Sequence, residues 1–331
     1  MPGPASGPAR RDAPARNAAC EGCHLEIAAE WRSSLHHHAY TDATYARALA
    51  REPTAFCRGC HAPEADPTRA APPALARLGV GCVSCHAPNH AGLDDAVWAG
   101  PGDGADARAP HPVRRSADFA GVPGCASCHE FDFAEQPGMT MQRTVLEHAA
   151  SRFAARSCAD CHMPIAGAGP GRHRSHDFAA SRDPAVLRGA LDIAATRTRE
   201  GLTLRLTPAA VGHAMPTGDL FRRLYIATEG LDIEGEVVAA DARTLGRRFT
   251  TRRLSDLVTR KIEVADDRPG ARGPAATVVS LDLGPSTEDL RVRWRVLHQR
   301  VELPLLDDAA VIAGEIEIAA GTLPPFEVHT P

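Results

Sequence analysis

The sequence predicts two dissimilar parts: an N-terminal domain of short α-helices and loops, and a C-terminal antiparallel β-sandwich. Three observations support this division. All ten cysteines lie between residues 20 and 161. From about residue 200 onwards, apolar residues alternate with polar ones, which is typical of strands with one buried face. The chain of 331 residues is also long enough for two domains.

The ten cysteines make up five copies of the motif Cys-x-x-Cys-His. In order, the copies are Cys20, Cys23 and His24; Cys57, Cys60 and His61; Cys82, Cys85 and His86; Cys125, Cys128 and His129; and Cys158, Cys161 and His162. This motif is typical of covalent c-type haem attachment. The two thiols add to the porphyrin vinyl groups, and the histidine ligates the iron as its proximal ligand. The sequence therefore predicts five covalently bound haem c groups.

Two other interpretations of the cysteines explain less of the pattern. Structural zinc sites usually join two Cys-x-x-Cys half-sites into a closed cage of four ligands, and five half-sites cannot pair evenly. Disulfides would suit an exported protein with ten cysteines, but they give no reason for five identical histidine positions. Haem attachment accounts for all fifteen residues.

The segment that carries the motifs is short for the number of haems that it is predicted to bind. Residues 20–162 are 143 residues, or about 29 for each haem. Such a segment cannot bury a normal core of side chains, so the porphyrins are expected to form the apolar interior. Apolar residues at helical spacing predict helices over 24–35 and 140–155. Loss of the haems is expected to unfold this domain.

The remaining boundaries follow from composition and strand pattern. Residues 1–19 are rich in Pro, Ala and Gly and are predicted to be a disordered leader. The haem domain is placed at 20–185, because Asp183-Pro184 is typical of the start of a helix, and the β-sandwich at 186–331. The predicted strands cover 202–206, 223–229, 233–239, 276–283, 290–296, 300–306 and 312–318.

Composition also limits location and partners. Covalent haem attachment takes place outside the bacterial cytoplasmic membrane, which predicts a periplasmic or extracellular protein. Residues 1–19 contain no apolar signal region and no segment is long enough to span a bilayer, so an export signal or membrane anchor is expected outside this sequence. The net charge is −4 and no basic run contains interleaved aromatics, which argues against nucleic acid. Arginine is suited to pairing with haem propionates.

The sixth ligand of each iron decides between an electron carrier and an enzyme. Eleven histidines lie outside the motifs, namely His36, His37, His38, His90, His111, His148, His173, His176, His213, His298 and His329. His90 follows His86 by four residues and is expected to be a ligand. His298 lies on the apolar face of a predicted strand and is expected to be a core residue. Lys261, the single lysine, lies in the β part, and methionine ligands stay open.

Four segments carry a resemblance to a known family. They are Trp31-x-x-Ser34-x-His36, Cys158-x-x-Cys161-His162-Met163-Pro164, His173-x-x-His176-Asp177-Phe178 and Gly212-His213-Ala214-Met215-Pro216-Thr217-Gly218. With them the chain resembles the multihaem c-type cytochromes allied with the tetrahaem cytochrome partner of hydroxylamine oxidoreductase, the cytochrome c-554-like group. Larger members of that group also carry a β domain. The match covers residues 20–220 well and the β part loosely.

The resemblance implies three of the five expected distal ligands. It carries over to His36, His176 and His213, although His37 or His38 could replace His36, and His173 could replace His176. The chain departs from the family after Gln142-Arg143-Thr144-Val145-Leu146-Glu147, where relatives often have Trp and this chain has His148. His148 is therefore expected either to be a ligand specific to this protein or to be a polar helix residue. Together with His90, these residues complete the predicted set.

The sequence favours electron transfer through closely packed, mostly bis-His haems, with redox proteins as partners. One alternative is a multihaem reductase or oxidase of a small nitrogen or sulfur species, acting at one haem with an open coordination position. The pentahaem nitrite reductases mark such a haem with Lys in place of the motif histidine, and this chain has no such motif. A further alternative is a subunit of a multihaem conducting assembly, and an oligomer is compatible with the sequence. No catalytic residue is singled out.

Overall fold

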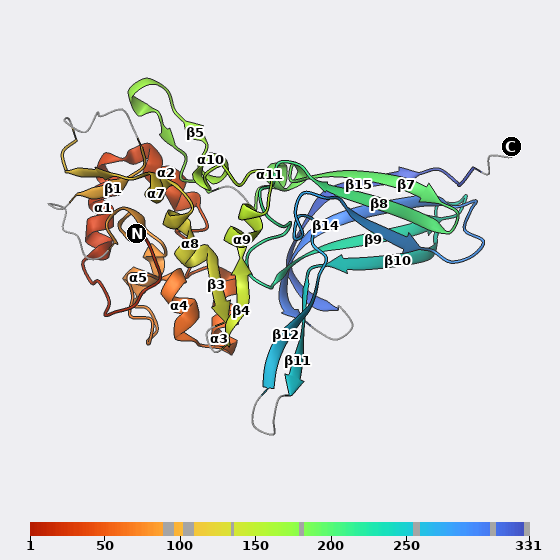
Figure 1. Cartoon of the computed structure of the whole chain (residues 1–331), viewed down its shortest axis with the longest axis horizontal. Coiled ribbons are helices and arrows are strands. Elements are labelled where there is room, and N and C mark those ends of the chain that lie inside the picture. Colours follow the sequence, from red (N-terminus) through yellow and green to blue (C-terminus); the bar gives the residue numbers. More distant parts are fainter. Residues whose placement is uncertain are drawn as a thin grey trace. The chain divides into compact units, whose positions relative to one another are not determined.

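The computed structural model describes residues 1–88, 96–101, 109–133, 136–178, 182–253, 259–304 and 309–327. The chain divides into two compact units. The first comprises Met1–Ala134 and Ala155–Ala179, and the second comprises Glu135–Ala154 and Ala180–Pro331. The first unit is built from short helices and the second mainly from antiparallel strands (Figure 1). The two predicted classes of structure are therefore confirmed.

Short helices in the first unit carry the five motifs. The helices of this unit are α1 (Ala13–Cys23), α2 (Leu25–Ser33), α3 (Ala43–Arg51), α4 (Ala55–His61), α5 (Pro73–Leu78), α6 (Cys82–His86), α7 (Ala117–Ala120), α8 (Pro123–His129) and α10 (Ala159–His162). Each motif lies at the C-terminal end of its helix: the histidine is the last residue of α4, α6, α8 and α10, and it directly follows α1. One helical turn places residues three apart on the same face, so both thiols of a motif lie on one side.

The side-chain core of the first unit is small. Its buried apolar cluster consists of Ala13, Trp31, Ala62, Ala65, Leu75, Leu78, Val83 and Ala87. Half of these are alanines, which bury little surface and contribute little hydrophobic free energy. Trp31 also donates a hydrogen bond from its indole N–H to the Val80 carbonyl, at 2.8 Å. A core of this size agrees with the expectation that porphyrins supply most of the apolar interior.

Residues 1–19 differ from the disordered leader that composition predicted. Helix α1 begins at Ala13, which is fully buried. The Arg10 guanidinium forms an ion pair with the buried Glu64 carboxylate at 2.9 Å, and the Ala5 amide donates to the Gly59 carbonyl at 2.9 Å. The prediction failed because it judged the segment by its own Pro, Ala and Gly content. The partners that order it lie more than fifty residues further along the chain.

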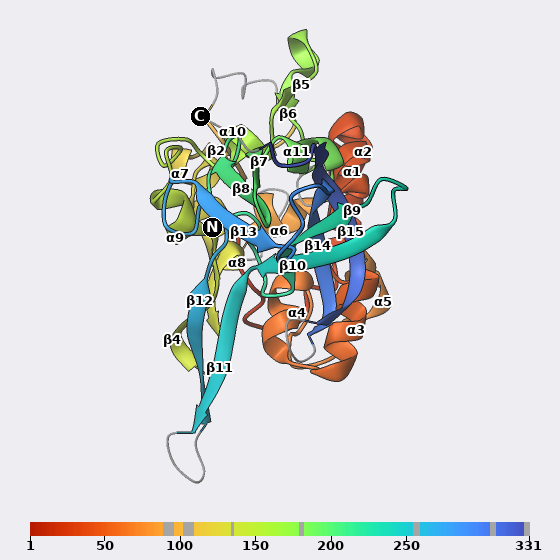
Figure 2. The ribbon, with the colours of Figure 1, turned by 90° about the vertical axis from the view of Figure 1, so that its right-hand side faces the viewer.

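Besides β4 (Gln136–Arg143), the second unit contains nine of the described strands, all in antiparallel pairs. They are β7 (Leu191–Thr198), β8 (Gly201–Pro208), β9 (Arg222–Leu231), β10 (Val237–Leu245), β11 (Arg247–Arg253), β12 (Thr259–Asp266), β13 (Thr277–Asp282), β14 (Arg291–Pro304) and β15 (Ala310–Leu323). One sheet has the order β10-β9-β14-β15 and another the order β13-β8-β7. Figure 2 shows the hairpin of β11 and β12 extending away from the other strands of this unit.

Both larger sheets contribute to a single hydrophobic core, as alternation predicted. Leu202, Leu204 and Leu206 of β8 are fully buried, and so are Val292 and Val296 of β14. The predicted strand at 233–239 is the least accurate. Residues 232–236 form a turn closed by the Asp232 carboxylate, which accepts from the Glu236 amide at 2.8 Å, and β10 begins only at Val237. An exposed Ile233 produced the misleading pattern.

The unit boundaries also differ from those predicted. The segment Glu135–Ala154 belongs to the second unit, although the motifs on both sides of it belong to the first. It contains β4 (Gln136–Arg143) and α9 (Thr144–Ala149) where one helix over 140–155 was predicted. The predicted start of a helix at Asp183 is confirmed, since its carboxylate accepts from the Ala185 amide at 2.8 Å at the beginning of α11 (Pro184–Arg188).

Five short strands complete the described part of the first unit. The strands β1 (Val97–Ala99) and β2 (Val113–Arg115) pair in parallel, and β5 (Ile165–Ala166) and β6 (His173–Arg174) pair antiparallel. The strand β3 (Glu130–Phe133) directly follows the motif of α8. Within the described ranges, no helix is long and apolar enough to cross a membrane.

His298 is a core residue of β14, as predicted, and it makes the second unit sensitive to acid. Its side chain is 3% exposed, and burial together with Arg222 and Arg300 lowers its pKa from 6.5 to about 4. The neutral ring is therefore favoured in the folded state. The resulting stability, on the order of 3 kcal/mol, is complete above pH 6.5 and is lost as the pH falls towards 4.

We expect His298→Phe to flatten the pH dependence of unfolding of the β strands, measured by far-UV circular dichroism in urea at pH 4 to 7. The apolar ring keeps the packing but takes up no proton. The difference between wild type and variant isolates His298 from other titrating groups. Equal slopes for the two proteins between pH 6.5 and 4 would show that His298 does not control this dependence.

Candidate haem sites

In the first unit, three pairs of imidazoles have nearly the same distance between their ring centres. The ring centres are 6.4 Å apart for His24 and His111, 6.2 Å for His36 and His129, and 6.1 Å for His86 and His176. A metal–imidazole bond is about 2 Å long, so two imidazoles on opposite sides of one metal have ring centres roughly 6 Å apart. In each pair one histidine belongs to a Cys-x-x-Cys-His motif. The residues present thus fit a six-coordinate haem iron at three motifs.

Hydrogen bonds orient several of these rings. The Nδ1 of His86 lies 2.6 Å from the Trp98 carbonyl, and the Nδ1 of His176 lies 2.8 Å from the Arg174 carbonyl. A carbonyl oxygen can only accept, so Nδ1 carries the proton and Nε2 keeps its lone pair. Metal-ligating histidines are commonly held in this way. The tautomer at His86 and His176 is therefore the one that presents Nε2 to a metal.

Burial keeps the imidazoles of His36 and His86 neutral, as ligation requires. Desolvation, followed by the nearby imidazole of His129 and further histidines, lowers the pKa of His36 from 6.5 to about 3. Desolvation also lowers the pKa of His86 to about 4, against the opposing effect of its bond to the Trp98 carbonyl. A neutral imidazole offers the lone pair that a metal needs, whereas an imidazolium does not.

The structure distinguishes His176 from His173. Both ring nitrogens of His173 are occupied: Nδ1 by the Gly171 carbonyl at 2.7 Å, and Nε2 by the Glu30 carboxylate at 3.1 Å. These bonds raise the pKa of His173, because they favour its protonated form. The Nδ1 of His176 bonds to the Arg174 carbonyl, and its ring centre lies 6.1 Å from that of His86. The geometry therefore favours His176 as the ligand, in agreement with the family resemblance.

The run His36–His38 also divides into different environments. His36 is paired with His129, and the Phe178 ring packs edge-on against it at 4.2 Å. The ring centre of His37 lies 4.3 Å from that of Trp31, with the planes tilted by 47°. The His37 Nδ1 bonds to the Arg32 carbonyl at 2.9 Å. His38 is exposed. Of the three, His36 has the geometry of a ligand.

His61 has a different neighbour from the other motif histidines. The Tyr45 ring lies parallel to its imidazole, with centres 3.8 Å apart and planes at 7°. The Nδ1 of His61 donates to the Ala39 carbonyl at 2.6 Å. The Tyr45 hydroxyl is buried and has no hydrogen-bond partner among the described residues. Burial and the neighbouring Cys57 raise the pKa of Tyr45, so the hydroxyl keeps its proton.

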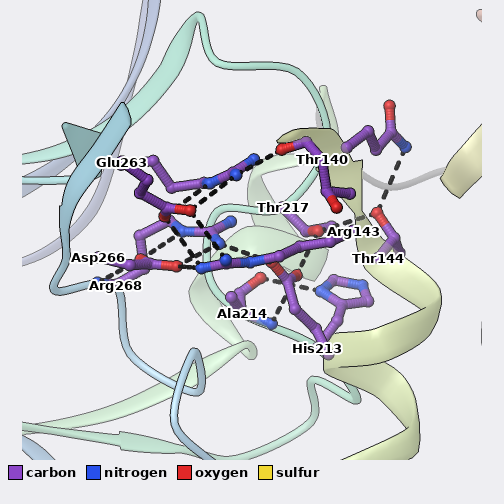
Figure 3. A network of polar contacts seen from close by, with 12 residues as sticks. Thr140, Arg143, Thr144, His213, Ala214, Thr217, Glu263, Asp266 and Arg268 are labelled. Atoms are coloured by element: carbon purple, nitrogen blue, oxygen red, sulfur yellow. Dashed lines mark hydrogen bonds and ion pairs between the residues drawn. The ribbon is translucent and has the colours of Figure 1, made fainter. Parts of the chain in front are cut away.

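The remaining predicted ligands are placed as follows. His90 lies outside the described residues. His148 and His213 belong to the second unit, where the His148 ring lies against the backbone at Gly212. The Nδ1 of His213 donates to the Ala214 carbonyl at 2.9 Å, the same kind of bond that orients His86 and His176 (Figure 3). His162 is half-buried, and desolvation lowers its pKa.

The motif thiols lie close to one another across motifs. Cys60 is within hydrogen-bonding distance of Cys128, and Cys125 of Cys158. Cys85 interacts electrostatically with Cys125 and Cys128. None of the ten cysteines forms a disulfide with another cysteine. Because each thiol marks one edge of a bound porphyrin, the attachment points of neighbouring motifs are adjacent in space.

Two buried arginines in the same unit have nitrogens without a partner. The Arg10 Nη2 and the Arg58 Nε are buried, and no described residue accepts a hydrogen bond from them. Buried unpaired donors are costly unless a ligand satisfies them. Haem carries two propionates, and guanidinium groups pair well with carboxylates. These two arginines therefore fit propionate partners.

Comparison with known proteins gives one family match and one similar solved structure. Residues 19–87 match the family described as "Cytochrome c554 and c-prime". Among solved structures, the chain is similar to a penta-heme cytochrome c552 from Thermochromatium tepidum. The TM-score is 0.69 at 19% sequence identity, over 93% of this chain and 98% of that one. No curated protein matches the chain. These findings, with the motifs, support a multihaem c-type cytochrome that is cytochrome c554-like.

Sequence reasoning missed two residues of these sites. His111 was one of eleven candidates, and His90 was preferred because it is close in sequence to His86. His111 reaches His24 from a distant loop, which spacing could not reveal. Tyr45 carried no sequence signal, apart from being one of three tyrosines in the chain.

The hydrogen bonds of His173 and His176 predict opposite effects of two similar substitutions. We expect His176→Ala to convert one low-spin ferric haem to high spin, because the iron facing His86 loses its sixth ligand. His173→Ala should leave the low-spin signals unchanged. Electron paramagnetic resonance of the purified ferric proteins measures both. Conversion in the His173 variant alone would reverse the assignment.

Proposed function

We propose that this protein is an electron-transfer cytochrome with five covalently bound haem c groups, most of them ligated by two histidines. The observation that carries the proposal is the set of three imidazole pairs with ring centres 6.1–6.4 Å apart. The corresponding assignments are His111 opposite His24, His36 opposite His129, and His176 opposite His86. An iron with two protein ligands has no position left for a substrate, which favours carrying electrons over catalysis.

The protein's contribution is to hold the carriers close and to set their environment. Each bound haem supplies one one-electron carrier. The contacts of Cys60 with Cys128 and of Cys125 with Cys158 support closely spaced attachment points. The carbonyls of Trp98 and Arg174 fix the ligand rings, and such bonds to ligating histidines also tune the potential. His213 and His148 are the ligands proposed from the second unit, and His90 stays a proposal from sequence.

The location and the partners of this protein are proposed from its class alone. A c-type cytochrome is expected to work in the periplasm or outside the cell, and to exchange electrons with redox proteins through small, transient interfaces. The β unit, whose two larger sheets share one core, is proposed to be a sandwich that serves as a support or interaction module. Assembly with further copies is compatible with this role.

A second candidate function rests on one observation, the environment of His61. The Tyr45 ring stacks on the face of this imidazole, and its buried hydroxyl has no hydrogen-bond partner among the described residues. A phenol of this kind would suit the role of proton donor if one haem with an open coordination position reduced or oxidised a small nitrogen or sulfur species.

The two candidates predict different spectra for the purified ferric holoprotein. For electron transfer we expect low-spin signals from at least three haems, unchanged after addition of nitrite or hydroxylamine, and reductive titration by five electrons. Electron paramagnetic resonance and anaerobic titration measure these. High-spin signals at the three paired haems would contradict the proposal.

Tyr45→Phe distinguishes the second candidate, since it removes the hydroxyl and keeps the ring. If Tyr45 is the proton donor of a catalytic haem, the variant should turn nitrite over at least about tenfold more slowly than the wild type, a typical effect of losing a proton donor. If the protein is only a carrier, neither variant nor wild type reduces nitrite, and the low-spin haems are identical in both.

A further inference from the structure

Glu147 is a buried carboxylate on α9, directly before His148 and in contact with the loop that carries His213. Its side chain is 2% exposed. Its Oε2 accepts hydrogen bonds from the Thr217 hydroxyl at 2.6 Å and from the Ala214 amide at 3.2 Å. Its Oε1 accepts from Arg268 at 2.5 Å. Burying a carboxylate is costly unless charge and hydrogen bonds compensate, and here both are present.

The partners of Glu147 are themselves held by further ion pairs, all within the second unit (Figure 3). Arg268 donates to the Asp266 carboxylate at 2.7 and 2.8 Å and to the Pro216 carbonyl at 2.7 Å. Arg143 pairs with Glu263 at 3.0 Å and also with Asp266. Each acid of this cluster faces at least one guanidinium. The cluster is therefore a fixed framework rather than a group of mobile surface charges.

Glu147 and the Pro269 carbonyl hold the two peptide groups that follow His213, and the His213 ring bonds to the second of them. The amide between His213 and Ala214 donates to Glu147, at 3.2 Å. The next amide, of Met215, donates to the Pro269 carbonyl at 2.8 Å. The carbonyl of that same peptide group, on Ala214, accepts from the His213 Nδ1 at 2.9 Å. Both peptide planes are thus fixed from outside the loop, and the ring bonds to one of them.

Gly270 allows the segment Arg268–Gly270 to lie close to the loop that carries His213. Gly270 has φ +82°, and a Cβ at this position would lie 2.9 Å from the His213 carbonyl oxygen. Any other residue would push the loop away. The loop 212–217 is therefore held between Glu147 of α9 and the segment Arg268–Gly270.

We propose that Glu147, acting through Thr217 and the Ala214 amide, is the positioning residue that holds the His213 Nε2 in place as an iron ligand. The inference rests on the proposed function, in which His213 is a distal ligand. Glu147 does not touch the iron. Its role is to restrict the movement of the loop, so that His213 dissociates from the metal rarely.

The test uses the ferric holoprotein and Thr217, where the hydroxyl can be removed without unpairing Arg268. Thr217→Val removes the hydroxyl bond to Glu147 and keeps the shape, and Thr217→Ser restores the hydroxyl. We expect cyanide to bind the His213-ligated haem about three- to tenfold faster in the Val variant, the effect of losing one hydrogen bond. The Ser variant should match wild type. Stopped-flow absorbance measures the rate.

Two further variants complete the design. Glu147→Gln should accelerate cyanide binding at least as much as the Val variant, because it also weakens the bond to Arg268. Glu229→Gln is the matched control, since Glu229 pairs with Arg293 at 2.7 Å on the exposed side of the same unit. It should leave the rate unchanged. Circular dichroism checks that each variant is folded, and the Val and Ser pair suffices if Glu147→Gln does not fold.

His213→Ala separates the failure of this inference from failure of the ligand assignment. If the Ala variant converts one haem to high spin, but the Val and Gln variants bind cyanide at the wild-type rate, the positioning role of Glu147 is overturned and the ligation stands. If the Ala variant keeps all low-spin haems, His213 is not a ligand, and both the assignment and the inference that rests on it are overturned.

Discussion

In the proposed bis-histidine arrangement, the first unit depends on one coordination constraint: the ring centres of two imidazoles must lie roughly 6 Å apart, with each Nε2 directed at the iron. Short helices meet half of this constraint locally, because a motif histidine at the end of a helical turn is fixed relative to its two cysteines. The other half must come from elsewhere in the chain. His36, His111 and His176 come from a turn after α2, a loop before β2 and the segment after β6. The loops are therefore as much determined by the cofactor as the helices are.

This constraint also explains why the unit has so little side-chain core. Its buried cluster is half alanine, whereas the β unit buries leucines, isoleucine and valines from both of its larger sheets. Hydrophobic free energy scales with buried apolar area, so the first unit needs the porphyrin faces and the second does not. The buried ion pair of Arg10 and Glu64 connects the chain before α1 to the rest of the first unit.

The sequence predicted what is encoded locally and failed where the determinant was distant. The motifs and the alternation of Leu202, Leu204 and Leu206 identified cofactor, helices and strands. His298 was correctly predicted to be a core residue, because its place on an apolar face is a local property. His111 could not be preferred over His90 by spacing, since its partner His24 lies far away in the sequence. The order of residues 1–19 likewise depends on Gly59 and Glu64. The family resemblance favoured His176 and left His173 open, and their hydrogen bonds support the choice of His176.

The central claim is that three irons are each held between a motif histidine and a distant one. It is tested most directly by a crystal structure of the holoprotein with its haems bound. We predict electron density joining iron to the Nε2 atoms of His24 and His111, of His36 and His129, and of His86 and His176. Density showing water, methionine or an empty position opposite His24, His86 and His129 would contradict the account.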